Sequence, residues 1–315
     1  MSALLQMTSP VIDLLYEVRA LPLSGQEAVV TGFAMAPGGG FNAMIAARRA
    51  GMAAVCGGTL GTGPFARMVA TALDAQGIPS AQPSLPDRDA GCCTVLIEPS
   101  GERSFVHADG AEGVMRPETL AAIDLTGIGW VLISGYSLRD PATANALGNW
   151  VTGTPALPPL VFDPSPLVAE LSPEALAPIM ARTAWISANA QEATVLTGLA
   201  DPTAAARALA RGRQGAVVRD GAAGCILATG DLCQQIPPHK VQPIDTNGAG
   251  DTHIGSFIAR LDATGDALHA AHYANIAAAL STTRKGPATA PQRPEVETLM
   301  TSRPAQTHAR METHP

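Results

Sequence analysis

Apolar residues along this chain alternate between short runs and longer stretches with helical spacing. A short apolar run bounded by polar residues or glycine indicates a buried strand, because a core helix needs more residues. The predicted strands are 53–56, 130–134, 160–163, 185–187 and 215–219. The predicted helices are 42–50, 65–75, 117–123, 141–151, 173–181, 190–196, 202–211, 248–263 and 266–280. This alternation indicates an α/β fold with three layers, α/β/α, around a mostly parallel central sheet.

Two segments do not follow the alternation. Residues 27–35 and 91–107 read as extended chain, and the second contains a turn at 99–102 between two strands. We expect them to form a small β-sheet lid from about 25–37 and 91–110. The predicted domain spans 1–300. Residues 301–315 lack apolar periodicity and are predicted to be a disordered tail.

Composition and charge exclude several classes of protein. The chain has 315 residues, of which 20 are basic and 27 acidic, and it contains no cluster of Lys and Arg. A net charge of −7 therefore argues against a nucleic-acid partner. No apolar stretch reaches about 18 residues, and the N-terminus does not read as a signal peptide. The 5 cysteines include no Cys-x-x-Cys pair and indicate free thiols. We expect a cytoplasmic protein with no membrane partner.

The segment 245–251, Asp-Thr-Asn-Gly-Ala-Gly-Asp, directly precedes an apolar helix. Gly248 and Gly250 flank Ala249 and leave the N–H groups of a helix start uncovered, where an anion such as phosphate binds well. A carboxylate in the first turn would repel a phosphate that is only bound. Asp251 is therefore interpreted as a general base for a hydroxyl nucleophile, beside an anion hole of Gly248, Ala249 and Gly250. The alternative is a helix cap.

A second glycine cluster, 37–43, leads into a predicted helix. The bare backbone at Gly38 and Gly39 and the Asn42 side chain at the helix start are suited to sugar hydroxyls. The alternative is a tight strand-to-helix turn. Neither a phosphate-binding P-loop nor a dinucleotide-binding Gly-x-Gly-x-x-Gly turn is present, which disfavours those two nucleotide folds.

Taken in order, these motifs resemble the ribokinase (PfkB) family of carbohydrate kinases, from about residue 11 to 291. The family signature Gly-Gly-x-x-x-Asn-x-Ala has Pro37 at its first position here and Met44 in place of Ala, while Asp-Thr-x-Gly-Ala-Gly-Asp is complete. The segment 101–103, Gly-Glu-Arg, resembles the lid hairpin. The resemblance implies a ribokinase-like fold, and a sugar kinase that uses ATP and Mg²⁺ to phosphorylate an alcohol of a small carbohydrate.

The resemblance also implies roles for individual residues. The residues implied to hold the sugar are Asp13, Gly38, Gly39, Asn42 and Asp251. Those implied to hold the nucleotide are Asn189, Glu192, Arg219, Gly221, Gly248, Gly250 and Asn275, with Glu192 in the magnesium network. Those implied to surround a monovalent cation, K⁺, are Asp245, Asn247, Ser281, Arg284 and Gly286.

Several positions depart from ribokinases proper. Gly135 and Tyr136 follow the strand where ribokinases carry a sugar-binding Glu, and Gly39 stands in place of their Lys. His253, two residues after the proposed base, is expected to be a packed or substrate-edge histidine. An aromatic content of 4% favours a sugar over a nucleoside, which would stack on aromatic rings. A nucleoside kinase of the same fold and a catalytically weak sugar- or nucleotide-sensing protein remain alternatives. An exposed lid further predicts a homodimer.

Overall fold

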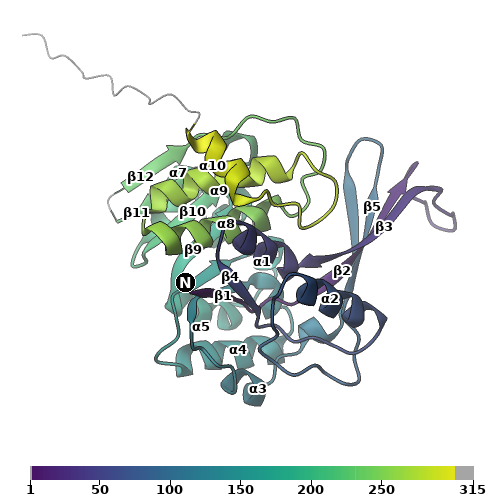
Figure 1. Ribbon diagram of the computed structural model, residues 1–315, viewed down its shortest axis with the longest axis horizontal. Coiled ribbons are helices and arrows are strands. Elements are labelled where there is room, and N and C mark those ends of the chain that lie inside the picture. The colour runs from purple at the N-terminus through teal and green to yellow at the C-terminus, as the bar shows by residue number, and fades with distance from the viewer. Residues whose placement is uncertain (1, 231, 302–315) are drawn as a thin grey trace, which may run out of the picture.

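The computed structural model of the chain describes residues 2–230 and 232–301, and it contains one large sheet between two layers of helices (Figure 1). The strand order of the large sheet is β12-β11-β10-β9-β8-β7-β1-β4. Its strands are β1 (Ala3–Gln6), β4 (Ala53–Cys56), β7 (Ile128–Ser134), β8 (Leu160–Asp163), β9 (Thr183–Asn189), β10 (Gly215–Arg219), β11 (Cys225–Thr229) and β12 (Leu232–Ile236). The strands from β4 to β10 pair in parallel, and β11 and β12 form an antiparallel edge.

The helices cover both faces of this sheet. They are α1 (Gly40–Arg49), α2 (Pro64–Ala75), α3 (Pro117–Ala121), α4 (Pro141–Gly153), α5 (Pro173–Arg182), α6 (Ala190–Thr197), α7 (Pro202–Ala210), α8 (Ala249–Thr264), α9 (Ala267–Ser281) and α10 (Arg293–Thr301). Leu4 and Leu132 pack with α1, α8 and α9, whereas their neighbours Leu5 and Val131 pack with α3, α4 and α5 on the other face. Because successive strand residues point to opposite faces, a strand between two helix layers is apolar throughout. The predicted three-layer α/β fold is confirmed.

A smaller sheet of four strands stands beside this body, in the order β3-β2-β5-β6 (Figure 1). Its strands are β2 (Pro10–Val18), β3 (Val30–Gly39), β5 (Cys92–Ile97) and β6 (Arg103–Ala108). The segments predicted for this sheet supply β3, β5 and β6. The inner strand β2, which carries Asp13, was not predicted, because its run of apolar residues lies close after β1 without a helix between them.

Two further elements differ from the sequence prediction. The short strand β1 lies in the middle of the large sheet, and α10 ends the described chain; neither was predicted. The predicted tail begins at Thr301, which is the last residue of α10, and its remainder lies outside the described residues. Among the helices that the structure describes, none is both long and apolar enough to cross a membrane.

Candidate active site

A cavity of about 970 Å³ opens where the parallel strands of the large sheet end. Asp163, Asn189 and Arg219 are the last residues of β8, β9 and β10, and all three line it. Ligands of open α/β sheets bind at this carboxyl edge. The predicted site residues in the wall are Gly39, Asn189, Glu192, Arg219, Gly221, Asn247, Gly248, Ala249, Gly250, Asp251 and Asn275. The predicted residues outside this lining are Asp13, Gly38, Asn42, Asp245, Ser281, Arg284 and Gly286.

The start of α8 forms one wall of the cavity. Gly248 precedes the helix with a φ of 70°, a left-handed conformation that favours glycine, and no side chain caps the helix there. A Cβ atom at Gly248 would also lie 3.2 Å from the Asn42 amide nitrogen. The first turn therefore has no side-chain cap between its N–H groups and the cavity, which is the arrangement that an anion site at a helix start requires.

Asp251, in the first turn of α8, is held by Asn42 of α1. The Asn42 Nδ2 donates to Asp251 Oδ2 at 3.0 Å, and the Asn42 Oδ1 accepts from the Ala288 N–H at 2.9 Å. Burial raises the pKa of Asp251 to about 7, with a smaller upward contribution from Asp163 and opposing effects of Asn42 and Arg219. A carboxylate with a pKa near neutrality is suited to accept a proton from an alcohol.

The two helices that carry this pair approach each other closely. Gly255, one turn further along α8, has so little space that a Cβ atom there would lie 2.3 Å from the Ala43 carbonyl oxygen of α1. Ala43 directly follows Asn42. The absence of a side chain at 255 thus sets the approach of α1 to α8, and with it the Asn42 to Asp251 hydrogen bond.

Asp13 lies on β2 beside Gly38 of β3. A Cβ atom at Gly38 would be 2.3 Å from Asp13 Oδ2, so the glycine makes room for the carboxyl group. Asn247 Nδ2 donates to the same oxygen at 3.4 Å. Burial raises the pKa of Asp13 to about 6, against the lowering effect of Asn247. Gly38 therefore supports Asp13, whereas the sequence had suggested that its backbone contacts the ligand directly.

Glu192, Asp163 and Arg219 form a charged group in the wall of the cavity, next to the start of α8. Asn189 and Glu192 form a capping box at the start of α6, which holds the Glu192 carboxylate in place. Arg219 Nη2 lies 3.5 Å from Glu192 Oε2 and 3.7 Å from Asp163 Oδ1, and its guanidinium is 3.8 Å from a Cβ position at Gly250. Burial and the charge of Asp163 raise the pKa of Glu192. This arrangement places the positive charge of Arg219 beside the start of α8.

These oxygen donors fit a magnesium ion held indirectly. Mg²⁺ usually keeps several waters and takes few protein carboxylates together with phosphate oxygens. Glu192 and Asp163 both line the cavity, and Arg219 already contacts each of them. Contact with the ion through bound water is therefore the arrangement that these residues allow.

Asn275 of α9 and His253 of α8 both line the cavity and contact each other. The Asn275 amide donates to the Ile236 and Pro237 carbonyl oxygens at 3.1 and 3.2 Å, and its Oδ1 lies 3.1 Å from His253 Nε2. Burial and Arg219 lower the pKa of His253 to about 3, so the ring is neutral. His253 is a packed histidine that fixes Asn275 at the cavity edge.

Residues 8–293 match the family model described as pfkB family carbohydrate kinase. The chain belongs to this family. It is a phosphotransferase with an alcohol group as acceptor, and the predicted resemblance is confirmed.

Several known proteins are similar to the kinase in sequence or in fold. YegV of Escherichia coli K12, described as an uncharacterized sugar kinase, is 29% identical over 257 residues, which cover 80% of this chain and 79% of YegV. A candidate ribokinase II from E. coli, solved with ATP and Mg²⁺, has a TM-score of 0.83 at 22% identity, covering 96% of this chain and all of its own. The nucleoside kinase of Burkholderia thailandensis, solved with inosine, has a TM-score of 0.78 at 19% identity, covering 95% of each chain.

Asp245, the one acidic residue among those that the resemblance placed around a monovalent cation, already faces a guanidinium in this kinase. Asp245 Oδ1 accepts from Arg103 Nη2 at 2.6 Å, and Asp245 Oδ2 accepts from the Gly286 N–H at 2.9 Å. Arg284 donates to the Thr289 carbonyl oxygen at 3.3 Å. A second cation beside a guanidinium is unfavourable, because two like unit charges about 4 Å apart repel by about 4 kcal/mol near a protein surface.

Side chains of the small sheet and of the loop after β7 also line the kinase cavity, although none of them is in the set of site residues predicted from the sequence. They are Arg103, Phe105 and Tyr136. Arg103 and Phe105 alternate along β6 and so share one face of the strand. That alternation was the available signal, but it did not show which face would meet the cavity. Asp163 was also missed, although its place at the end of a predicted strand pointed to the same edge.

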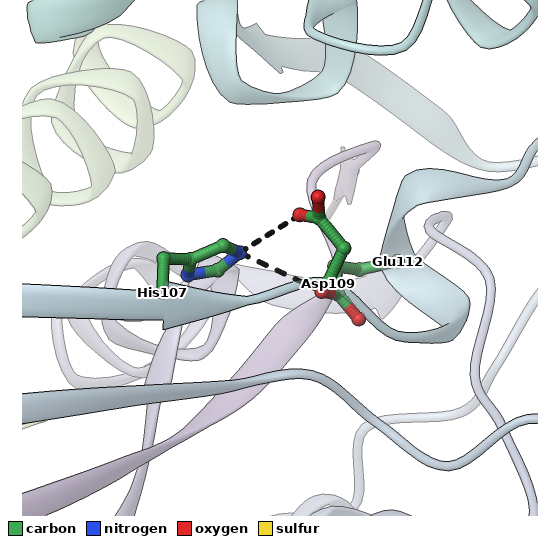
Figure 2. A group of neighbouring side chains, drawn as sticks. All are labelled: His107, Asp109 and Glu112. Atoms are coloured by element: carbon green, nitrogen blue, oxygen red, sulfur yellow. Dashed lines mark ion pairs between the residues drawn. The ribbon is translucent and has the colours of Figure 1, made fainter.

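His107, Asp109 and Glu112 form a cluster at the foot of the small sheet (Figure 2). The imidazole Nε2 lies 3.1 Å from Asp109 and 3.8 Å from Glu112. Arg139 binds Asp109 at 2.7 Å, and the N–H groups of Gly91 and Gly110 donate to Glu112. The carboxylates are thus already engaged by donors, and the cluster ties both ends of the β5–β6 hairpin to the body.

Proposed function

We propose that the kinase transfers the γ-phosphoryl group of ATP to a hydroxyl of a small free sugar, with Asp251 as general base. The observation that carries this proposal is the carboxylate with a pKa of about 7 beside an uncapped, anion-binding helix start, held by Asn42. A base and an anion hole on adjacent residues are what a phosphoryl transfer to an alcohol requires.

The transfer is a single displacement. Asp251 accepts the proton of the sugar hydroxyl, the hydroxyl oxygen bonds to the γ-phosphorus, and the bond from that phosphorus to the bridging oxygen of ADP breaks. The N–H groups at Gly248, Ala249 and Gly250 hold the charge on the transferred group, and Arg219 adds a positive charge beside Gly250. Glu192 and Asp163 would hold Mg²⁺, and the ion would supply charge neutralisation at the phosphates. The ATP and Mg²⁺ complex of the E. coli neighbour supports this assignment.

On the acceptor side, we assign Asp13, Asn42 and Gly39 to the sugar hydroxyls. Asp13 and Asn42 are 7% and 3% exposed, and each keeps hydrogen-bonding capacity beyond its contact with Asn247 or with Asp251 and Ala288. Gly38 acts indirectly by admitting the Asp13 carboxyl group. The small sheet would act as the lid, since Arg103 and Phe105 from β6 line the cavity that must exclude water during the transfer.

A nucleoside acceptor is the second candidate, and one observation favours it. Phe105 and Tyr136 line the cavity and are 61% and 50% exposed, so their faces are available to a base. A coupled ADP-release screen over pentoses, hexoses, sugar acids and nucleosides decides between the two. Turnover with a free sugar supports the first candidate, and turnover only with nucleosides supports the second. Binding of ATP and sugar without ADP release would instead indicate a sensing protein.

We further propose that the kinase is a homodimer joined through the small sheet. Phe33, Met35 and Val106 lie on one face of that sheet and are 54%, 46% and 62% exposed, an apolar patch suited to a second copy. A monomeric mass by light scattering at micromolar concentration would contradict this assembly. The free thiols of all 5 cysteines also suit a kinase of the cytoplasm, where ATP is available.

A further inference from the structure

The loop that contains Asp245 contacts the segment 284–290, and arginine side chains bind both of them. Asp245 is only 12% exposed, and its Oδ1 accepts from Arg103 Nη2 at 2.6 Å and from the Asn247 N–H at 2.8 Å. Arg103 Nη1 also donates to Thr246 Oγ1 at 3.1 Å. One guanidinium thus binds two side chains at the start of the segment that forms the anion hole.

The carbonyl oxygens of the facing segment are bound in the same way. Arg49 donates to the carbonyl oxygens of Ala288 and Ala290, and Arg284 donates to that of Thr289. The Ser281 carbonyl oxygen accepts from Thr289 Oγ1 at 3.0 Å. Carboxylate and carbonyl oxygens are the ligands of hard cations, and here these oxygens already have hydrogen-bond donors.

The local charge leaves little attraction for an additional cation. Two further carboxylates beside the loop are paired, Glu295 with Arg284 and Glu17 with Lys285 at 3.1 Å. Burial and the nearby charge of Arg284 lower the pKa of Arg49, as expected where positive charges are crowded. An inorganic cation would therefore enter a region whose negative charges are already neutralised.

We propose that the guanidinium of Arg103 is the resident cation of this loop, so that the kinase needs no inorganic monovalent cation. This proposal rests on the proposed function in one respect, which is that the phosphoryl group is transferred at the segment 245–251. Arg103 belongs to β6 of the small sheet, whereas Asp245 belongs to the body. The small sheet consequently supplies a positive charge to the segment that forms the anion hole.

The first test is the salt dependence of the unmodified kinase. Sugar-dependent ADP release is measured in KCl, NaCl and tetramethylammonium chloride at equal ionic strength, with the nucleotide as its Tris salt. We expect rates within about twofold of one another. Stimulation by K⁺ of more than about tenfold over tetramethylammonium would overturn the proposal, whatever the variants show.

The second test is chemical rescue of Arg103→Ala. We expect this variant to lose at least about tenfold in turnover in tetramethylammonium chloride, and to recover at least about threefold when guanidinium chloride or KCl is added at tens of millimolar. A purely structural role of the side chain would not be restored by a free ion. Wild-type turnover of the variant, or no recovery with either ion, would contradict the proposal.

Lys285→Met is the matched control, since it removes another basic contact between the small sheet and the same loop. We expect its rates in KCl and in tetramethylammonium chloride to stay as close to each other as those of the unmodified kinase. A K⁺ requirement equal to that of Arg103→Ala would overturn a special role of Arg103.

A binding measurement separates this proposal from the proposed function. ADP affinity is measured by calorimetry in KCl and in tetramethylammonium chloride, without any acceptor. Equal affinities for the unmodified protein, together with a K⁺-dependent affinity for Arg103→Ala, support the proposal even if the screen finds no sugar substrate. A K⁺-dependent affinity of the unmodified protein overturns it, even if sugar phosphorylation is found.

Discussion

The start of α8 and the small sheet both face the cavity, but they are built differently. Asp251 is fixed by Asn42, by the close approach of α1 at Gly255 and by a buried helix, so its geometry is set by the body of the fold. The small sheet instead presents Phe105 and other large apolar side chains that are mostly exposed. The start of α8, which we call the rigid region, is suited to the phosphoryl transfer that all acceptors share. The small sheet, which we call the open region, is suited to selecting one acceptor over another. Variants in the two regions should therefore fail in different ways.

The largest effect is expected from the rigid region. Asp251→Asn removes the proposed proton acceptor with little change in shape, and we expect turnover to fall by a factor on the order of 10² to 10⁴. ATP affinity, measured by calorimetry, should stay near that of the unmodified kinase. Turnover that is unchanged in steady-state kinetics would show that another group accepts the proton.

A smaller effect is expected at the junction of the two regions. Asp13→Asn keeps the volume beside Gly38 but removes a charged hydrogen-bond acceptor, which is worth roughly 1.5–3 kcal/mol, or about 10- to 150-fold. We expect the KM for the acceptor to rise by this factor, while the KM for ATP stays nearly constant. An equal change in both KM values would place Asp13 outside the acceptor site.

The pH dependence of kcat/KM tests whether Asp251 acts as the general base. Asp251 must be deprotonated to accept a proton, and its raised pKa is about 7. We therefore expect kcat/KM to rise about tenfold per pH unit below pH 7 and to level off above it. A second, steeper fall below about pH 6 would report Asp13. A flat profile from pH 5 to 8 would contradict a base of this pKa.

The smallest effect is on stability. The folded pKa of Asp251 lies above its unfolded value, so its favourable contribution is present below about pH 4 and is lost as the pH rises through about 7. Asp251→Asn avoids this loss, and we expect it to unfold with a free energy about 1–2 kcal/mol higher than the parent at pH 8 and nearly equal at pH 4. Urea titrations at the two pH values measure the difference. A variant that is less stable at pH 8 would show that the carboxylate is stabilised in the fold.

Most of the large sheet could be predicted from the sequence because each buried strand is a short apolar run with a helix on either side. The strands β1 and β2 could not, since they follow each other closely and their apolar residues merge into one stretch. Their separation depends on β1 pairing with β4 and β7, while β2 pairs with β3 and β5. Such long-range pairing leaves no local signal.

The candidate site shows the same limit. Gly248, Gly250 and Asp251 could be found because their motif is contiguous and its chemistry follows from neighbouring residues. Arg103 could not be placed, since its partner Asp245 is far away in the sequence and lies in the loop before α8. The family resemblance implied potassium beside Asp245, but it could not indicate that Arg103 would contact this carboxylate.

The missing side chain at Gly255 has a consequence for redesign. The space between α1 and α8 at this position does not admit even one methyl group. The distance between Asp251 and the Asn42 amide is therefore kept when residues elsewhere are changed. Variants with new acceptor preferences can then be sought by changing the strands of the small sheet alone. The geometry of Asp251 and Asn42 would stay the same in all of these variants.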